Sequence, residues 1–300
     1  MIAALTDVIL PVLLVAAVGF VLARRFPLDT LTMTKLGLYA TTPALAFEAM
    51  MTTQLDPTVG MRLVLAYLLA TVVVAVASWL VTWRWPGRTR RAVIACTILG
   101  NNGNFGLPIA LLTLGHEGLQ MAIVIFIVSV VVMYTAGPLI FGSSGGVLGG
   151  LRAVATLPVA WAIALAGLFR ALNFTLPTGV MSGIDLLGQA AIPLVLLQLG
   201  AQIAASRGIV RSAPVITAVA LRTILVPLAV VGAAFALGLT GLAFASLLLA
   251  AVMPIAVNSL ILAREYDGDV ETVASAVLIS TLLAIPLLAA LIPLLAHLPA

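Results

Sequence analysis

Long apolar stretches, separated by short polar segments, account for most of the chain. A helix needs about 20 apolar residues to cross the hydrocarbon core of a bilayer, and ten stretches of roughly that length follow one another in the sequence. They cover residues 2–23, 35–52, 62–83, 91–114, 119–141, 152–170, 184–205, 211–238, 241–263 and 271–297. The second is the weakest, because Glu48 interrupts it. The pattern predicts an all-α polytopic membrane protein with ten transmembrane helices.

The composition agrees with this and excludes several classes of protein. Hydrophobic residues make up 63% of the chain and charged residues only 8%, whereas soluble domains carry about 25% charged residues. A soluble globular enzyme and a disordered chain are therefore excluded. Cys96 is the single cysteine, so no internal disulfide can form, and the two histidines have no metal-ligand spacing. We expect no metal centre, no organic cofactor and no nucleic-acid partner.

The basic residues lie mainly in the loops, unevenly between the two sides of the membrane. Eleven Lys and Arg residues, Arg264 among them, follow the odd-numbered stretches, against only Arg62 and Arg170 after the even-numbered ones. The positive-inside rule then places both termini outside the cytoplasm, which we expect to be the periplasmic side of a bacterial inner membrane. No basic residue precedes the first stretch, while Arg24 and Arg25 follow it, so we expect a permanent span rather than a cleaved signal peptide.

Glycine and serine are concentrated at residues 142–151, midway along the chain. Such a composition is typical of a flexible linker, and it separates five stretches in residues 1–141 from five in residues 152–300. Because five is an odd number, the second half must enter the membrane in the opposite orientation. The sequence therefore predicts two inverted five-helix repeats, a layout typical of secondary transporters.

Interruptions recur at corresponding places in the two halves. Pro43 in the second stretch is followed five positions later by Glu48, and Pro193 in the seventh by Gln198. We interpret these prolines as helix-break hinges. The fourth stretch is interrupted at residues 100–108 and the ninth at residues 253–259. A single proline commonly does no more than kink a membrane helix, but matched breaks in corresponding helices are the best sequence pointer to a transporter's binding site.

The interruptions of the fourth and ninth stretches indicate a site for an anion. We expect one half-helix to end near Leu99 and another to begin near Leu107, while Pro254 opens a half-helix in the ninth stretch. A helix N-terminus carries about half a positive charge and free N–H groups, so two of them meeting at mid-membrane would attract a small organic anion. The candidate substrate-binding residues are Asn101, Asn102, Gly103, Asn104, Gly106, Pro108, Pro254, Asn258 and Gln198.

Two ionisable residues are candidates for a coupling ion or a charge pair, because a charge inside a membrane is costly unless it is paired. Arg222 lies near the middle of the eighth stretch. It contacts the substrate, pairs with an acidic group, or extends toward the cytoplasmic surface. Glu48 either carries a proton or binds a sodium ion, or it is simply an acid at the outer rim.

The two interruptions also carry a family resemblance. Residues 100–108, GNNGNFGLP, resemble the fourth-helix signature of bacterial members of the auxin efflux carrier family. Residues 254–266, PIAVNSLILAREY, are similar to the ninth helix and following loop of that family, and residues 280–286 resemble its tenth helix. Plant auxin carriers have a long insertion between the halves, which residues 142–151 replace here.

The resemblance implies two inverted repeats of five helices in which the fourth and ninth helices are broken and cross. It implies a transport domain that moves elevator-fashion against a scaffold domain, and carboxylates such as auxin, malate and malonate as substrates.

A secondary transporter of small organic anions is therefore the leading hypothesis, with the substrate bound where the fourth and ninth helices cross. The alternatives are an anion channel and a membrane-embedded enzyme, although the sequence shows no acid pair, metal motif or serine with a base that an enzyme would need. Transport is coupled to Na⁺ or H⁺, or is uncoupled. The expected partners are the substrate anion, the lipid bilayer and a second copy of the chain in a homodimer.

Overall fold

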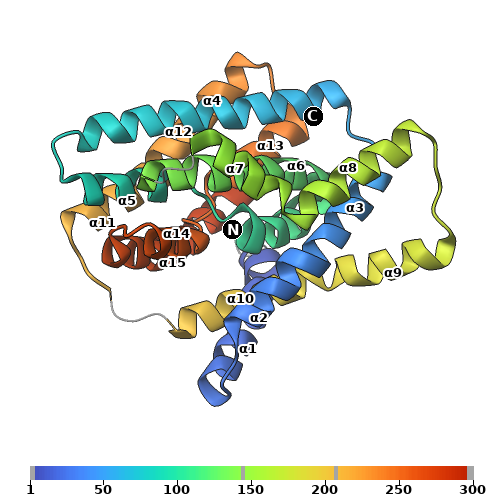
Figure 1. Cartoon of the computed structure of the whole chain (residues 1–300), viewed down its shortest axis with the longest axis horizontal. Helices are drawn as coiled ribbons and strands as arrows, with labels where there is room; N and C mark the ends of the chain where they lie inside the picture. The colour runs from blue at the N-terminus through green and yellow to red at the C-terminus, as the bar shows by residue number, and fades with distance from the viewer. Residues whose placement is uncertain (1–3, 143–145, 206–208, 296–300) are drawn as a thin grey trace.

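The computed structural model describes residues 4–142, 146–205 and 209–295. Within these ranges the chain is mainly helical and has no strand (Figure 1). The helical segments are η1 (Ala4–Ile9), α1 (Leu10–Arg25), α2 (Thr30–Leu36), η2 (Gly37–Thr41), α3 (Thr42–Thr52), α4 (Pro57–Thr82), α5 (Gly87–Ile98), η3 (Asn102–Gly106), α6 (Leu107–Phe141), α7 (Gly146–Ala155), α8 (Pro158–Ala171), α9 (Thr178–Gln189), α10 (Ala191–Ala205), α11 (Ala213–Ala220), η4 (Leu221–Leu225), α12 (Val226–Ala236), α13 (Gly241–Ala251), α14 (Asn258–Glu265) and α15 (Val270–Leu295). The segments labelled η are π-helical.

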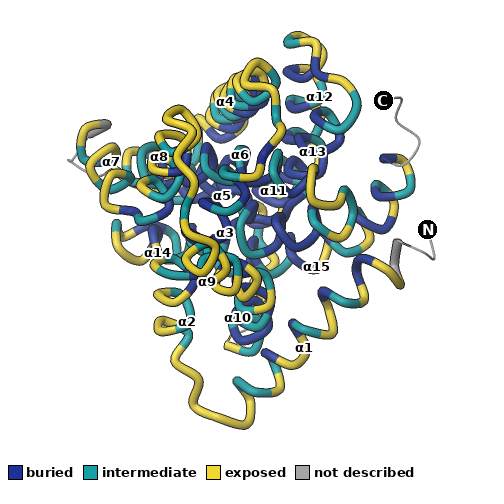
Figure 2. The backbone as a smooth tube through the Cα atoms, turned by 90° about the vertical axis from the view of Figure 1, so that its right-hand side faces the viewer, coloured by how far each residue is buried: buried dark blue, intermediate teal, exposed yellow. Residues whose placement is uncertain are grey.

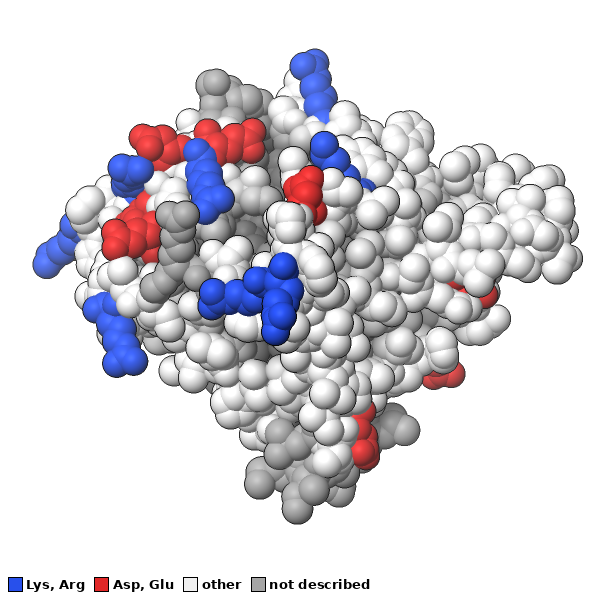
Figure 3. Space-filling view, turned by 90° about the horizontal axis from the view of Figure 1, so that it is seen from below, with Lys and Arg blue, Asp and Glu red and all other residues white. Residues whose placement is uncertain are grey.

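Several of these segments join into stretches that can cross a membrane. In the described part of the chain, six stretches are long and apolar enough: Thr6–Arg25, Pro57–Thr82, Asn102–Phe141, Thr178–Ala205, Ala213–Ala236 and Val270–Leu295. The all-helical, multi-pass prediction is thus confirmed, whereas the number of ten spans stays a prediction. The surface agrees with a bilayer environment, since charged side chains gather on one part of the face shown in Figure 3 and leave a broad uncharged area beside them.

The sixth predicted stretch differs from a single span over residues 152–170. α7 and α8 meet at an angle of 70°, because Pro158 begins α8 and disfavours helical geometry in the residue before it. α7 instead packs along α6, where Gly150 lies so close to the backbone of Thr135 that a β-carbon would be 2.5 Å from its Cα. The chain is therefore helical again from Gly146, inside the range expected to be a linker.

All four π-helical segments directly precede a proline in the first turn of the next helix. The prolines are Pro11 after η1, Pro43 after η2, Pro108 after η3 and Pro227 after η4. A proline has no N–H and its ring collides with the carbonyl four residues earlier. A π turn relieves this by changing the local hydrogen-bond spacing. Pro43 thus widens a helical stretch that continues from Thr30 to Thr52 rather than ending it.

Polar caps fix several helix starts at the membrane surface. The carboxylate of Asp56 accepts a hydrogen bond from the Thr58 N–H at 2.7 Å at the start of α4. This backbone bond is the main reason why the pKa of Asp56 lies below its ordinary value. Asp29 caps α2 in the same way through the Leu31 N–H and the Thr32 hydroxyl.

Buried apolar residues form two cores (Figure 2). The first lies mainly among α4, α5, α11, α12 and α13 and includes parts of α6 and α15. The second joins α1, α3 and α10 to the other parts of α6 and α15. In Figure 1, α4 and α12 lie at one edge of the molecule, while α1, α2 and α10 lie at the opposite edge.

The helices α1 and α10 cross in especially close contact. A β-carbon added at Gly19 would overlap the carbonyl oxygen of Leu197, and one added at Gly200 would overlap that of Ala16. Small residues at such crossings allow two helix backbones to approach and gain van der Waals contact where there is no water to drive association.

Gly200→Ala should therefore separate these helices and lower the free energy of unfolding by about 1–3 kcal/mol, the usual cost of overpacking. Gly167→Ala in α8, where a β-carbon would meet nothing within 4 Å, is the matched control and should be neutral or slightly stabilising. Thermal unfolding in detergent measures both. Equal melting temperatures for the two variants would contradict the close crossing.

Candidate functional site

The two interruptions of the fourth and ninth stretches meet in space. α5 ends at Ile98 and α13 ends at Ala251, and the residues that follow each are not helical. The Asn101 N–H donates to the Pro254 carbonyl at 2.8 Å, and the Ala256 N–H donates to the Leu99 carbonyl at 2.8 Å. These bonds make an antiparallel bridge centred on Gly100 and Ile255. Backbone groups freed by the breaks thus satisfy one another, as they must when no water is near.

Arg222 joins the ends of both first half-helices. Its guanidinium donates from Nε to the Met253 carbonyl at 2.9 Å, from one terminal nitrogen to the Thr97 carbonyl at 3.2 Å, and from the other to the Ala250 carbonyl at 3.5 Å. The residue is only 3% exposed. Thr97 lies in the last turn of α5, while Ala250 and Met253 lie at the end of α13.

The charge of Arg222 is compensated by helix ends rather than by an acid. Among the described residues the one ion pair within 4.0 Å joins Arg88 and Asp267, so no carboxylate there partners Arg222. A helix C-terminus carries about half a negative charge, and the guanidinium lies against two of them. The sequence left substrate contact, an acidic partner and extension to the cytoplasmic surface open for Arg222, and the structure shows bonds to backbone carbonyls instead.

Gly100 is required by this arrangement. A β-carbon at that position would overlap the guanidinium of Arg222 and lie 2.9 Å from its Cζ. Gly103 is also tightly enclosed, by the ring of Phe126, whereas a β-carbon at Gly106 would make only an ordinary contact with Met253. Gly100 and Gly103 therefore allow close packing at the crossing.

Asparagine side chains beside the bridge have polar atoms without partners. Asn102 donates from Nδ2 to the Tyr67 hydroxyl at 3.1 Å, but its buried Oδ1 accepts no bond in the described part of the chain. The Nδ2 of Asn101, also buried, donates none there. An unpaired buried polar group costs about 1–3 kcal/mol. Asn104 and Asn258, at the starts of the second half-helices, are partly exposed.

The remaining predicted site residues lie in different surroundings. Pro108 is buried in the first turn of α6. Pro254 was predicted to open a half-helix, but it lies in the non-helical bridge, where its carbonyl accepts a hydrogen bond, and α14 begins only at Asn258. Gln198 donates from Nε2 to the Thr34 hydroxyl at 2.7 Å, which ties α10 to α2. Pro193 lies in the first turn of α10. Glu48 is on α3, which packs chiefly on α8 and α9 rather than on either broken helix.

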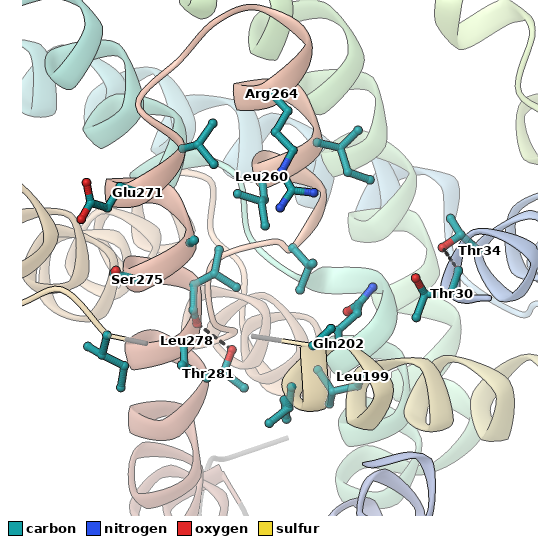
Figure 4. A pocket seen from close by; sticks show the side chains of 18 of the residues that line it. Thr30, Thr34, Leu199, Gln202, Leu260, Arg264, Glu271, Ser275, Leu278 and Thr281 are labelled. Atoms are coloured by element: carbon teal, nitrogen blue, oxygen red, sulfur yellow. Dashed lines mark hydrogen bonds between the residues drawn. The ribbon is translucent and has the colours of Figure 1, made fainter. Parts of the chain in front are cut away.

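A large cavity opens beside the crossing. Its volume is about 830 Å³, and it is lined by α2, α10, α14, α15 and the residues Ile209 and Val210 (Figure 4). Val257, which ends the second interruption, lines it at one end of α14, and Arg264 lines it at the other end. The cavity thus gives a route from one surface of the protein toward the second break.

Three residues of this region are not among the site residues that the sequence predicts. Tyr67 binds Asn102, Gln202 lines the cavity with a buried Oε1 that has no partner among the described residues, and Arg264 faces the cavity. Gln202 lies one turn after Gln198, which is the only sequence signal for it. In the sequence, Arg264 is one of the basic loop residues that predict the orientation in the membrane, and it belongs to the motif at residues 254–266.

Comparison with known proteins assigns the family. A family model described as membrane transport protein, which is that of the auxin efflux carriers, matches residues 4–148 and 151–292. The chain belongs to the auxin efflux carrier family. It is also 27% identical over 295 residues to an uncharacterized transporter of Methanothermobacter thermautotrophicus, covering 93% of this chain and 95% of that protein. This carrier is therefore a multi-pass membrane transport protein, and its family is one of transporters rather than enzymes.

Arg222→Met should lower the free energy of unfolding of the carrier by about 1–3 kcal/mol for each buried carbonyl that is left unpaired. Three buried carbonyls would lose their donor. Gly100→Ala should act in the same direction, because the β-carbon displaces the guanidinium. Gly87→Ala, with no neighbour within 4 Å, is the matched control. Melting temperatures in detergent that are unchanged in Arg222→Met would contradict the assigned role.

Proposed function

We propose that the protein is a secondary transporter of small organic anions, such as malonate, malate or auxin-like acids, with the carboxylate bound where the two broken helices cross. The observation that carries this is the bridge between residues 99–101 and 254–256. It brings two helix starts, η3 with α6 and α14, to one place in the molecule.

The electrostatics of the crossing favour an anion. Arg222 compensates the C-terminal ends of α5 and α13, so the two N-terminal ends are left to attract negative charge. Together they supply roughly one positive elementary charge, which matches one carboxylate. The unpaired Nδ2 of Asn101 is a further donor at the same place, and Asn104 and Asn258 lie in the first turns of the second half-helices.

The wider architecture supports an alternating-access mechanism. We infer ten spans in two inverted repeats, residues 1–141 and 152–300, because the breaks occupy corresponding positions in the two halves. The two apolar cores support a division into a body around α4, α5 and α11–α13 and a scaffold around α1, α3 and α10. An elevator movement would slide the first body, with the crossing, along the second.

The proposed function also includes the ion that drives transport, the orientation of the protein in the membrane and its assembly. Glu48 is the candidate for Na⁺ or H⁺ coupling, and uncoupled export is the alternative, since the membrane potential drives an anion outward with about 2.3 kcal/mol per 100 mV. The distribution of basic residues supports periplasmic termini in a bacterial inner membrane. We also propose that two copies of the chain assemble as a homodimer.

Asn104→Ala and Asn258→Ala should each abolish saturable carboxylate transport and leave the melting temperature nearly unchanged, because both side chains are partly exposed. Counterflow of labelled malonate, malate and indole acetate in proteoliposomes measures this and separates a carrier from a channel, which shows no counterflow.

The matched control is Asn173→Gly, in the loop between α8 and α9, where Asn173 has a φ of 52° that glycine adopts readily. It should transport normally. Unchanged counterflow in both Asn104→Ala and Asn258→Ala would contradict the assignment of the site.

A further inference from the structure

One face of α14 lines the large cavity along the whole helix. Val257, Leu260, Ile261 and Arg264 all border the cavity, and their spacing places them on one side of a helix. Val257 directly precedes the helix and Arg264 is in its last turn. With a rise of 1.5 Å per residue, Arg264 lies about 9 Å along the axis from Asn258. The cavity thus leads from an arginine at the surface to the second break.

The guanidinium of Arg264 has no partner within the described part of the chain. Several other arginines there do: Arg88 binds Asp267, Arg90 the Trp83 carbonyl, and Arg170 the carbonyls of Met50 and Thr53. An arginine that served only to complement the C-terminus of α14 would be expected to bind its last carbonyls. The charge of Arg264 is therefore available to a ligand.

The surroundings of Arg264 suit a carboxylate. Figure 4 shows its side chain extending into the cavity and that of Gln202 reaching into it from α10. The buried Oε1 of Gln202 has no donor among the residues described, but as an acceptor it does not bind an anion, so Arg264 is the donor that the proposal uses. Glu271 also borders the cavity, from α15, but Figure 4 shows its carboxylate turned away from Arg264. The lining between these groups is mainly apolar.

We propose that Arg264 forms an anion-recruiting subsite at the mouth of this cavity, distinct from the crossing and occupied by a carboxylate before it reaches the crossing. The inference rests on the proposed function, because it takes the same anion as ligand. An unpaired guanidinium binds a carboxylate through two parallel N–H bonds and raises the local concentration of anions. Such a charge acts on the rate of association and on its salt dependence rather than on the translocation step.

The local potential can be measured without knowing the substrate. Ile261 is 52% exposed, borders the cavity and lies one turn before Arg264. The native Cys96 is buried, so Ile261→Cys supplies the thiol that reacts. This thiol is labelled with two methanethiosulfonate reagents, the negatively charged sulfonatoethyl and the positively charged trimethylammonioethyl compound. The ratio of the two labelling rates reports the electrostatic potential beside the thiol.

In this background, Arg264→Gln should lower the ratio of anionic to cationic labelling about tenfold at low salt, and the difference should shrink at 1 M salt, where the Debye length is about 3 Å. Arg264→Lys keeps the charge and should keep the ratio. Arg84→Gln is the matched control, because Arg84 is exposed and stacks on Trp83 outside the cavity. An unchanged ratio in Arg264→Gln would overturn the proposal.

Occupancy is tested by protection with malonate. Malonate should slow labelling of the same thiol by uncharged methyl methanethiosulfonate relative to sodium chloride of equal ionic strength, and Arg264→Gln should remove this protection. Protection that is absent, or that persists in Arg264→Gln, would overturn the subsite. Since labelling requires no transport, a failure here is distinct from a failure of counterflow, which would count against the proposed function.

Discussion

A buried guanidinium determines how the two broken helices can be arranged. Arg222 donates to carbonyls at the ends of α5 and α13, and these ends would otherwise present unpaired oxygens and like partial charges to each other in a region without water. Gly100 is part of the same constraint, since only a residue without a side chain leaves room for the guanidinium. The bridge between the two breaks then provides partners for backbone groups that the breaks leave without helical hydrogen bonds.

This arrangement makes the crossing electrically asymmetric. The negative helix ends are compensated by Arg222, while the positive ends at η3 and α14 are not matched by any acid in the bridge residues 99–101 and 254–256. A carboxylate is the ligand that such a field selects. The cavity along α14 adds a second positive group, Arg264, at the other end of the route. Positive potential at both ends of a mainly apolar passage suits an anion that must enter, bind and leave.

The sequence predicted the features that depend on local chemistry. Glycine, asparagine and proline at residues 100–108 predicted a half-helix that ends near Leu99, and α5 ends at Ile98. The second half-helix was predicted to begin near Leu107, but it begins at Asn102 with η3, which continues directly into α6. At Pro43 the sequence predicted a hinge, but a π turn and a break both remove the same hydrogen bond, so the proline alone does not distinguish them. The bend before α8 could not be predicted either, because Pro158 alone does not show whether the helix kinks or ends there.

Contacts between distant segments could not be predicted. The partners of Arg222 are backbone carbonyls 125, 31 and 28 positions away, and no residue type marks a carbonyl as an acceptor. Gln198 resembles a site residue by its position after Pro193, yet its amide binds Thr34 on α2, 164 positions away. Arg264 follows the positive-inside pattern, and only its position at the cavity separates it from the other loop arginines.

Anion binding by the native carrier is tested most directly by the thermal stability of the purified protein in detergent with malonate, malate, lactate, oxalate, indole acetate or a bile acid, with and without sodium. A ligand that binds the native state raises its apparent stability. An anion site at the crossing should give a saturable rise in melting temperature with at least one carboxylate and none with a neutral analogue of the same size. The same small response to every carboxylate and to its neutral analogue would contradict an anion site at the crossing.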